Sequence, residues 1–266
     1  MERAFIIWGI IISITAVAAA DLTIPVSASH NAVSGLIFLS ENPSGTNINP
    51  AFIYPGAEAG GSYLYNLADL PYYTLHLSTL SGQWGFYLGG SHLAHPLYQE
   101  TVSNLSFNLR RELYAFGISF RMLQTQIRNF DTARAFALDS GFIVYYDSFT
   151  LGFSLRNVSQ TRFQGQFLPI VVHWEVNHSL SRNSSLSVGI EKEKGYDFTL
   201  KFGAFHRLYP QLALLAGYQY EPDRIGAGII LLPAPLQVTY SFLTHRYLAP
   251  THFISLTYSF DKVVSE

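Results

Sequence analysis

Apolar and polar residues alternate along most of this chain, and few long apolar runs interrupt the pattern. Near the C-terminus, Ile254, Leu256, Tyr258 and Phe260 fall at every second position, and small polar residues such as Ser255 fall between them. Successive side chains of a strand point to opposite faces of a sheet, so this spacing predicts a strand with one apolar face. Similar segments recur from about residue 57 onward, which predicts an all-β fold.

Apolar and polar residues also alternate along the strands of a soluble two-sheet sandwich. Three features favour a membrane barrel over such a sandwich. The alternating segments run for about 9–11 residues, the length that crosses a membrane at a tilt. Their polar faces carry mainly Ser, Thr, Gly and Asn, and only 13% of the chain is charged, compared with about 25% in soluble domains. Tyr, Trp and Phe gather near segment ends, as in the aromatic girdles of barrels. The sequence therefore predicts a transmembrane antiparallel β-barrel.

The strand count and the lengths of the connections agree with such a barrel. Both ends of a bacterial barrel lie on the periplasmic side, where turns are short. The connections after even-numbered strands are short, as at Arg111-Glu112 and Asp147, whereas 124–132 and 158–166 are longer. We predict about fourteen strands, an even number as in bacterial barrels of this type. They are 58–66, 72–79, 83–92, 100–110, 113–123, 133–146, 148–157, 167–178, 184–192, 197–207, 211–220, 224–232, 235–244 and 251–260.

Composition excludes several classes of function. The chain has no cysteine, so it has no disulfide framework, no thiolate metal site and no cysteine nucleophile. Its formal net charge is −2 and no basic stripe is present, which argues against nucleic-acid binding. The histidines lack a metal-ligand spacing, and neither a phosphate loop nor a dinucleotide fingerprint occurs. We therefore expect no metal and no cofactor.

The one long apolar run lies at the start of the chain. Residues Ala4 to Ala20 are nearly all apolar, Arg3 precedes them, and three alanines end the run before Asp21. A basic start, a short apolar stretch and small residues at the end predict a secretory signal peptide, residues 1–20. The alternative is a membrane-anchoring helix, because the run reaches the lower edge of a spanning length.

Residues 21–56 lack the alternation that marks the rest of the chain. Two Asn-Pro pairs, Asn42-Pro43 and Asn49-Pro50, mark turns there. Apolar residues such as Leu36 and Ile37 are more than a solvated tail needs. We predict that this segment is a hatch or plug in the barrel mouth, with a loose periplasmic tail as the alternative. Residues 57–260 are then the barrel, and 261–266 a C-terminal tail.

The predicted lumen face carries a few charged residues. If the turn between two strands centres on Tyr196, Glu191 and Lys201 stand opposite each other on that face. This arrangement predicts a cross-strand ion pair. Four further polar residues are expected to fill and neutralise the lumen: Arg121, Arg156, His173 and Glu175.

Several short motifs, taken in order, resemble a known group of outer-membrane proteins. Asn49-Pro50-Ala51, before the first predicted strand, resembles the Asn-Pro-Ala motif of FadL-like barrels, although Phe52 stands where that family usually has a small residue. Leu155-Arg156-Asn157 and the strand from Leu214 to Tyr218 are similar to the PorV/PorQ branch. The resemblance implies a fourteen-stranded barrel with an N-terminal hatch. In it, four residues are ligand or plug candidates: Asn49, Pro50, Ala51 and Phe52.

The resemblance also implies function, in the outer membrane of a Gram-negative-type envelope. We expect either transport of a hydrophobic small molecule or a secretion-accessory role, with secreted protein as cargo, of the kind found in type IX secretion. Phe260 and its alternating neighbours resemble the signal that the barrel-assembly machinery recognises. The expected partners are therefore this machinery and outer-membrane lipid. The alternatives are a purely structural barrel and a phospholipase-like enzyme suggested by Asn177-His178-Ser179. We expect no enzyme, because those residues fall at a predicted turn.

Overall fold

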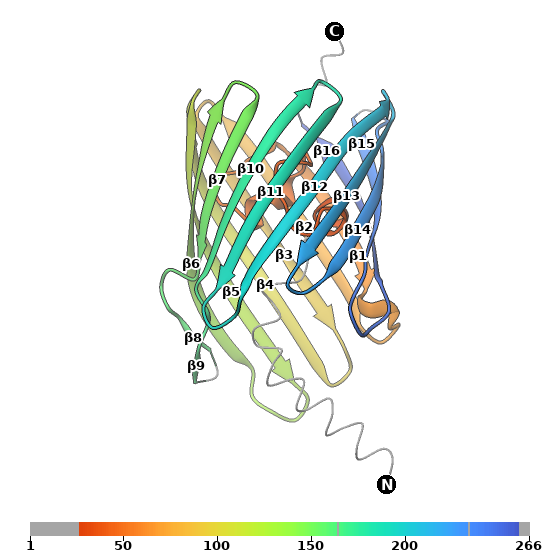
Figure 1. Ribbon diagram of the computed structural model, residues 1–266. Coiled ribbons are helices and arrows are strands. Elements are labelled where there is room, and N and C mark those ends of the chain that lie inside the picture. The colour runs from red at the N-terminus through yellow and green to blue at the C-terminus, as the bar shows by residue number, and fades with distance from the viewer. Residues whose placement is uncertain (1–26, 164, 234, 261–266) are drawn as a thin grey trace.

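The computed structural model describes residues 27–163, 165–233 and 235–260. The predicted signal peptide, the first part of the predicted hatch and the C-terminal tail lie outside the described residues. Within the described part, fourteen antiparallel strands form a closed barrel (Figure 1). β1 (Gly56–Tyr63) closes the wall by pairing with β16 (Thr251–Ser259). The prediction of an all-β barrel with about fourteen strands is confirmed.

Each strand of the wall pairs with its neighbours in chain order, so the topology is a simple up-and-down barrel. Between β1 and β16 the wall contains β2 (Pro71–Ser81), β3 (Trp84–Ala94), β4 (Tyr98–Arg110), β5 (Tyr114–Ile127), β6 (Ala133–Tyr146), β7 (Phe149–Arg156), β10 (Val171–Ser181), β11 (Ser184–Glu193), β12 (Phe198–Tyr209), β13 (Leu212–Tyr220), β14 (Arg224–Leu231) and β15 (Leu236–Leu243).

Several predicted strand boundaries are wrong by three or four residues, and two of these have a clear physical reason. The strand predicted from residue 167 begins only at Val171, because Pro169 lacks the N–H that a ladder needs. The residues before it form a small separate hairpin, β8 (Arg162–Phe163) with β9 (Gln166–Phe167). β1 ends at Tyr63 instead of residue 66, because Leu64–Asn66 forms a 3₁₀ turn.

The wall is apolar outside and polar inside. On the outer face, Leu75 is 66% exposed and Trp174 is 59% exposed. On the inner face, polar side chains such as Ser154, Thr239 and Ser241 are fully buried. This is the inverse of a soluble barrel and follows from the period of two in each strand. Within the described residues, no helix is long and apolar enough to cross a bilayer.

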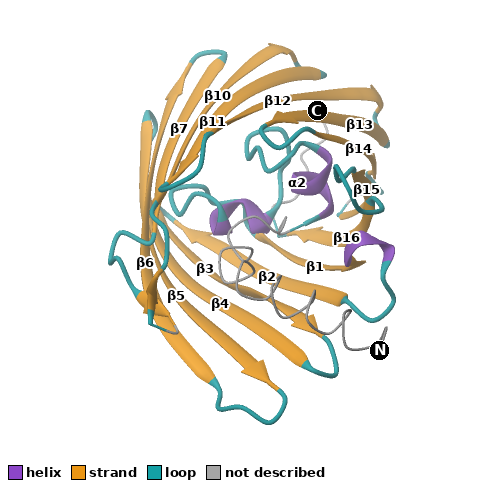
Figure 2. Ribbon diagram, turned by 60° about the horizontal axis from the view of Figure 1, so that its bottom comes forward, coloured by secondary structure: helices purple, strands orange, loops and turns teal. Residues whose placement is uncertain are grey.

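Residues 27–55, called the inner segment below, lie inside the ring of strands (Figure 2). The inner segment contains α2 (Ala28–Ala32) and a 3₁₀ helix, Pro43–Asn47. Ser27 begins α2, since its side chain accepts a hydrogen bond from the N–H of His30. Most side chains of the inner segment are buried, so the barrel encloses it instead of leaving a wide water-filled pore.

Glycines on the inner face of the wall let the inner segment come close. A Cβ at Gly217 would lie 2.6 Å from Val33 Cα, and a Cβ at Gly226 would lie 2.4 Å from the carbonyl oxygen of Ala32. Gly203, Gly217 and Gly226 are register partners on β12, β13 and β14, so they form one strip without side chains. Backbone can pack on backbone only along such a strip.

Gly217→Val should displace the end of α2 from the wall. The new side chain would overlap the Val33 backbone, and overpacking of this kind costs about 1–3 kcal/mol. We expect a lower thermal unfolding temperature and faster protease cleavage within the inner segment. Gly61→Val is the matched control, since a Cβ there meets its nearest atom, the Tyr72 oxygen, at an ordinary 3.5 Å. Equal cleavage of the two variants would contradict the close-approach argument.

Candidate functional site

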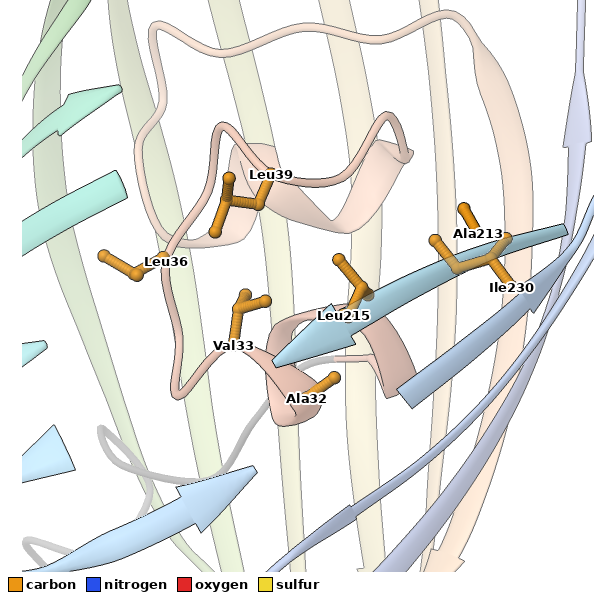
Figure 3. Packing of buried hydrophobic residues seen from close by; sticks show 7 residues of the cluster. All are labelled: Ala32, Val33, Leu36, Leu39, Ala213, Leu215 and Ile230. Carbon is orange, nitrogen blue, oxygen red and sulfur yellow. The ribbon is translucent and has the colours of Figure 1, made fainter. Parts of the chain in front are cut away.

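The candidate site is the contact between the inner segment and the lumen face of the wall. Its apolar part is a cluster in which side chains of the inner segment meet side chains of β13 and β14 (Figure 3). The cluster consists of Ala32, Val33, Leu36, Leu39, Ala213, Leu215 and Ile230. All seven are fully or almost fully buried. Burial of this apolar surface favours the bound position of the inner segment.

Glu175 of β10 holds the inner segment to another part of the wall, three strands away from β13. Its carboxylate accepts hydrogen bonds from the backbone N–H of Ile37, at 2.7 Å, and of Phe38, at 3.0 Å. In the register, Glu175 lies between Gly152 of β7 and Gly189 of β11. Neither neighbour has a side chain that could cover the carboxylate, so the backbone of the inner segment can reach it.

Glu175 belongs to a network of charged side chains on four neighbouring strands. His173 Nε2 lies 3.4 Å from Glu175 Oε2, and His173 Nδ1 lies 3.5 Å from Glu191 Oε2. The same Glu191 oxygen lies 3.3 Å from Arg156 Nη2 and 3.1 Å from Lys201 Nζ. Two carboxylates thus face two cations and an imidazole. Buried charges are tolerated when they are compensated in this way.

The predicted pairing of Glu191 with Lys201 needs a correction in register. Glu191 pairs with Thr199 and Lys201 pairs with Gly189, so the two charged residues are diagonal neighbours instead of directly opposite. The turn centres one residue earlier than predicted, because Gly195 adopts a φ of +97° that favours glycine. Both side chains still face the lumen, and the long lysine side chain spans the diagonal.

The Asn-Pro-Ala motif lies against β4 and β7. Asn49 Nδ2 donates to the Phe153 carbonyl at 3.2 Å, and its own Oδ1 accepts from the Ala51 N–H at 2.9 Å. From the wall, Asn108 Nδ2 donates to the Pro50 carbonyl at 3.2 Å. These bonds satisfy the backbone of a turn that has no strand partner of its own.

Phe52, the departure from the family pattern, packs within the inner segment. Its ring centroid lies 6.3 Å from that of Phe38. A Cβ at Gly45 would meet the Phe52 ring at 2.6 Å, so the glycine makes room for the ring. The structure therefore places Phe52 and the Asn-Pro-Ala residues together, at contacts that shape the inner segment.

A second polar contact, around His30 of α2, was not predicted. His30 Nδ1 lies 2.8 Å from Ser27 Oγ and 3.3 Å from Ser44 Oγ, and the Ser44 N–H donates to Glu58 of β1 at 3.3 Å. Burial, and to a smaller extent the neighbouring His76, lower the pKa of His30 to about 3. Its imidazole is therefore neutral at neutral pH. The only sequence signal that could have indicated this contact is the run of hydroxyl and amide residues in a segment that lacks alternating apolar and polar positions.

Arg121 lies apart from the network of Glu175. Its Nη2 is 3.1 Å from Asp139 Oδ1, and that carboxylate also accepts the Asn157 N–H at 2.6 Å. The pair joins β5 and β6 and fastens the chain just after the end of β7. Arg121 is thus a wall contact, and its partner Asp139 was not predicted.

The residues Asn177-His178-Ser179 lie within β10 and not at the predicted turn, and they do not form a hydrolase-like constellation. Asn177 faces the lumen and donates to Ser187 Oγ at 3.1 Å. His178 points the other way and stacks on Phe149, with ring centroids 4.2 Å apart. Adjacent strand positions face opposite sides, so these side chains cannot converge. Across the described residues, no group of three or more His, Asp or Glu is arranged to hold a metal ion.

Glu175→Ala should loosen the inner segment. The N–H groups of Ile37 and Phe38 would lose their acceptor, and an unsatisfied buried donor costs about 1–3 kcal/mol. We expect protease cleavage of the inner segment to accelerate on the order of tenfold or more. Asn177→Ala is the control on the same strand and face, because Asn177 bonds to Ser187 in the wall. Unchanged protection in Glu175→Ala would count against this anchor.

Acid should weaken the hold on α2. The pKa of His30 is about 3 in the folded protein against an ordinary value of 6.5, so folding favours the neutral imidazole. The contribution of the neutral imidazole to the free energy of unfolding is fully present above pH 6.5, and it is lost progressively as the pH falls toward 3. We expect the unfolding temperature of the wild type to fall more steeply with acid than that of His30→Gln. Parallel pH profiles of the two proteins would contradict the expectation.

Comparison with known proteins assigns the fold. No family model and no curated protein matches this chain. The crystal structure of a Pseudomonas aeruginosa FadL homologue matches with a TM-score of 0.61 and 12% identity, over 90% of this chain and 99% of that one. The CymD monoaromatic hydrocarbon channel matches with a TM-score of 0.64 and 10% identity, over 90% of this chain and 98% of that one. This chain therefore has the fold of FadL-type outer-membrane barrels.

Proposed function

We propose that this chain is an outer-membrane channel for hydrophobic solutes, a distant member of the FadL-like superfamily, and that its inner segment works as a hatch. The observation that carries the proposal is the anchoring of the inner segment to distant parts of one closed wall. The inner segment forms hydrogen bonds with Glu175 on β10, Asn108 on β4 and Ser241 on β15. A segment held from several sides blocks a straight path through the lumen, so passage requires it to move.

Location in the outer membrane is supported by the apolar outer face and by the connections. At one end of the barrel the strands are joined by short turns, such as 82–83 and 182–183. At the other end are longer connections, such as 64–70 and 157–170. In bacterial barrels the short turns face the periplasm. We therefore assign the end with the longer connections, the lower end in Figure 1, to the cell exterior.

A hydrophobic solute is favoured by apolar surface at two levels of the lumen. Near the end with the longer connections, Tyr72, Leu93 and Phe253 form one buried cluster with Ala28 of α2. The cluster in Figure 3 offers apolar surface on β13 and β14, beyond α2. Two structural neighbours, a FadL homologue and a monoaromatic hydrocarbon channel, support the same class of solute. The solute that we propose is a small apolar molecule.

The secretion-accessory role of the PorV/PorQ type, with protein cargo, stays a prediction from the sequence motifs. A deletion strain distinguishes this role from that of a solute channel. Loss of the channel lowers uptake of a hydrophobic compound and leaves the secreted proteins unchanged. Loss of a secretion accessory changes the secreted proteins. Recognition by the barrel-assembly machinery likewise stays a prediction.

A disulfide between the inner segment and the wall tests the hatch. The chain has no cysteine, so an introduced pair has no competitor. Asn31 Nδ2 donates to Ser241 Oγ at 3.1 Å, so Asn31→Cys with Ser241→Cys replaces two side chains that are in direct contact. In liposomes, we expect oxidation to slow toluene uptake about tenfold and reduction to restore it, because a tethered hatch cannot open.

The matched control is a disulfide within the wall, Asn177→Cys with Ser187→Cys, whose parent side chains also lie 3.1 Å apart. Oxidation of this pair should leave uptake unchanged. Equal uptake by the oxidised and reduced forms of the first pair would overturn the hatch. Failure of the wild type to carry toluene at all would overturn the channel.

A further inference from the structure

Charges on the two faces of the wall are arranged differently. The ion pairs of Arg121, Arg156 and Lys201 all lie on the lumen side. Three cations on the outer face, at the end with the longer connections, take part in none of them. We call these residues the rim cations: Arg134, Arg162 and Lys192.

Neutral neighbours, including aromatic rings, hold the rim cations in place. The Arg162 guanidinium lies 4.3 Å from the ring centroid of Phe167, and Lys192 Nζ lies 4.6 Å from that of Phe198. Phe167 is 61% exposed and Phe198 is 59% exposed, so both rings are on the outer surface. A cation over a ring is oriented without being neutralised.

Arg134 is the third member and has a similar surrounding. Its Nε donates to Gln124 Oε1 at 2.8 Å, a neutral acceptor on the neighbouring strand β5. Two residues further along β6, Phe136 is 69% exposed on the same face. The charge of Arg134 is therefore positioned by an amide and stands beside exposed apolar surface.

The three rim cations follow one stretch of the barrel rim. Lys192 on β11 pairs in register with Val172 on β10, a few residues after Phe167 of the β8–β9 hairpin. On its other side this hairpin packs beside β6, where Thr161 Oγ1 donates to the Phe136 carbonyl at 2.5 Å. Figure 1 shows the hairpin at the foot of β6.

We propose that the rim cations bind the phosphate groups of anionic lipid headgroups in the leaflet at this end of the barrel. The inference rests on the proposed membrane location. Exposed aromatic side chains mark the boundary between hydrocarbon and headgroups, and long basic side chains reach from there into the headgroup layer. Phosphate supplies the negative charge that no carboxylate contact gives these cations, since the rim cations take part in no ion pair with the described residues and the neighbouring carboxylate Glu193 belongs to the inner side of β11.

The chemistry favours a lipid over a soluble anion. The rim cations are spread over a curved outer wall, so no single small ion touches all three. A leaflet presents many phosphates at one depth, and each contact adds a similar increment, worth roughly a fivefold change in affinity. Screening by salt weakens such surface contacts.

The test uses the full barrel in nanodiscs of phosphatidylcholine with and without a minor fraction of lipid A. Retained lipid A is counted by native mass spectrometry at low and high salt. We expect Arg134→Gln/Arg162→Gln/Lys192→Gln to lower lipid A affinity on the order of a hundredfold and to remove its salt dependence. Arg110→Gln/Arg111→Gln/Arg182→Gln, which removes the same charge at the opposite end, should bind like the wild type.

Three outcomes would overturn the inference. The rim variant could retain lipid A like the wild type, the control variant could lose it equally, or free inorganic phosphate could displace the lipid. A rim variant that still inserts into phosphatidylcholine shows that folding is intact. If the wild type inserts into no bilayer, the proposed membrane location fails; if it inserts but does not prefer lipid A, only this inference fails.

Discussion

Closure of the wall is the constraint on which the rest of the structure depends. β1 pairs with β16 from Gly56 to Tyr63, so the wall has no open edge. A bilayer interior offers no hydrogen bonds to a free edge, and a closed ladder is the sheet solution to that problem. Once the ring is closed, alternate side chains must face inward, where small polar residues surround the inner segment.

The fit of the inner segment depends on where the wall lacks side chains. The strip of glycines on β12, β13 and β14 accepts the α2 end of the segment at backbone distance. Gly152 and Gly189 leave Glu175 open to the N–H groups of Ile37 and Phe38. The glycines provide the room and the carboxylate provides the hydrogen-bond acceptor. Both are needed, because room without an acceptor would leave the buried N–H groups of the inner segment unsatisfied.

Charge is divided between the two faces for one electrostatic reason. Inside, exclusion of bulk water makes an isolated charge costly, so Glu191 gathers Arg156, Lys201 and His173 around one oxygen. On the outer rim, Arg162 and Lys192 are accessible to solvent, so aromatic neighbours suffice to position them. This division explains how a chain with few charged residues carries both paired charges inside and unpaired cations on the outer rim.

The sequence by itself determined the all-β class, the strand number and the face of each strand, because the period of two is a local property of the backbone. It also identified Glu175 and Lys201 as lumen residues. Only the tertiary structure decided that Glu175 meets Ile37, that His30 meets Ser44, and that Glu191 and Lys201 are diagonal. Such contacts join residues far apart in the chain or depend on one turn dihedral, and neither leaves a periodic signal.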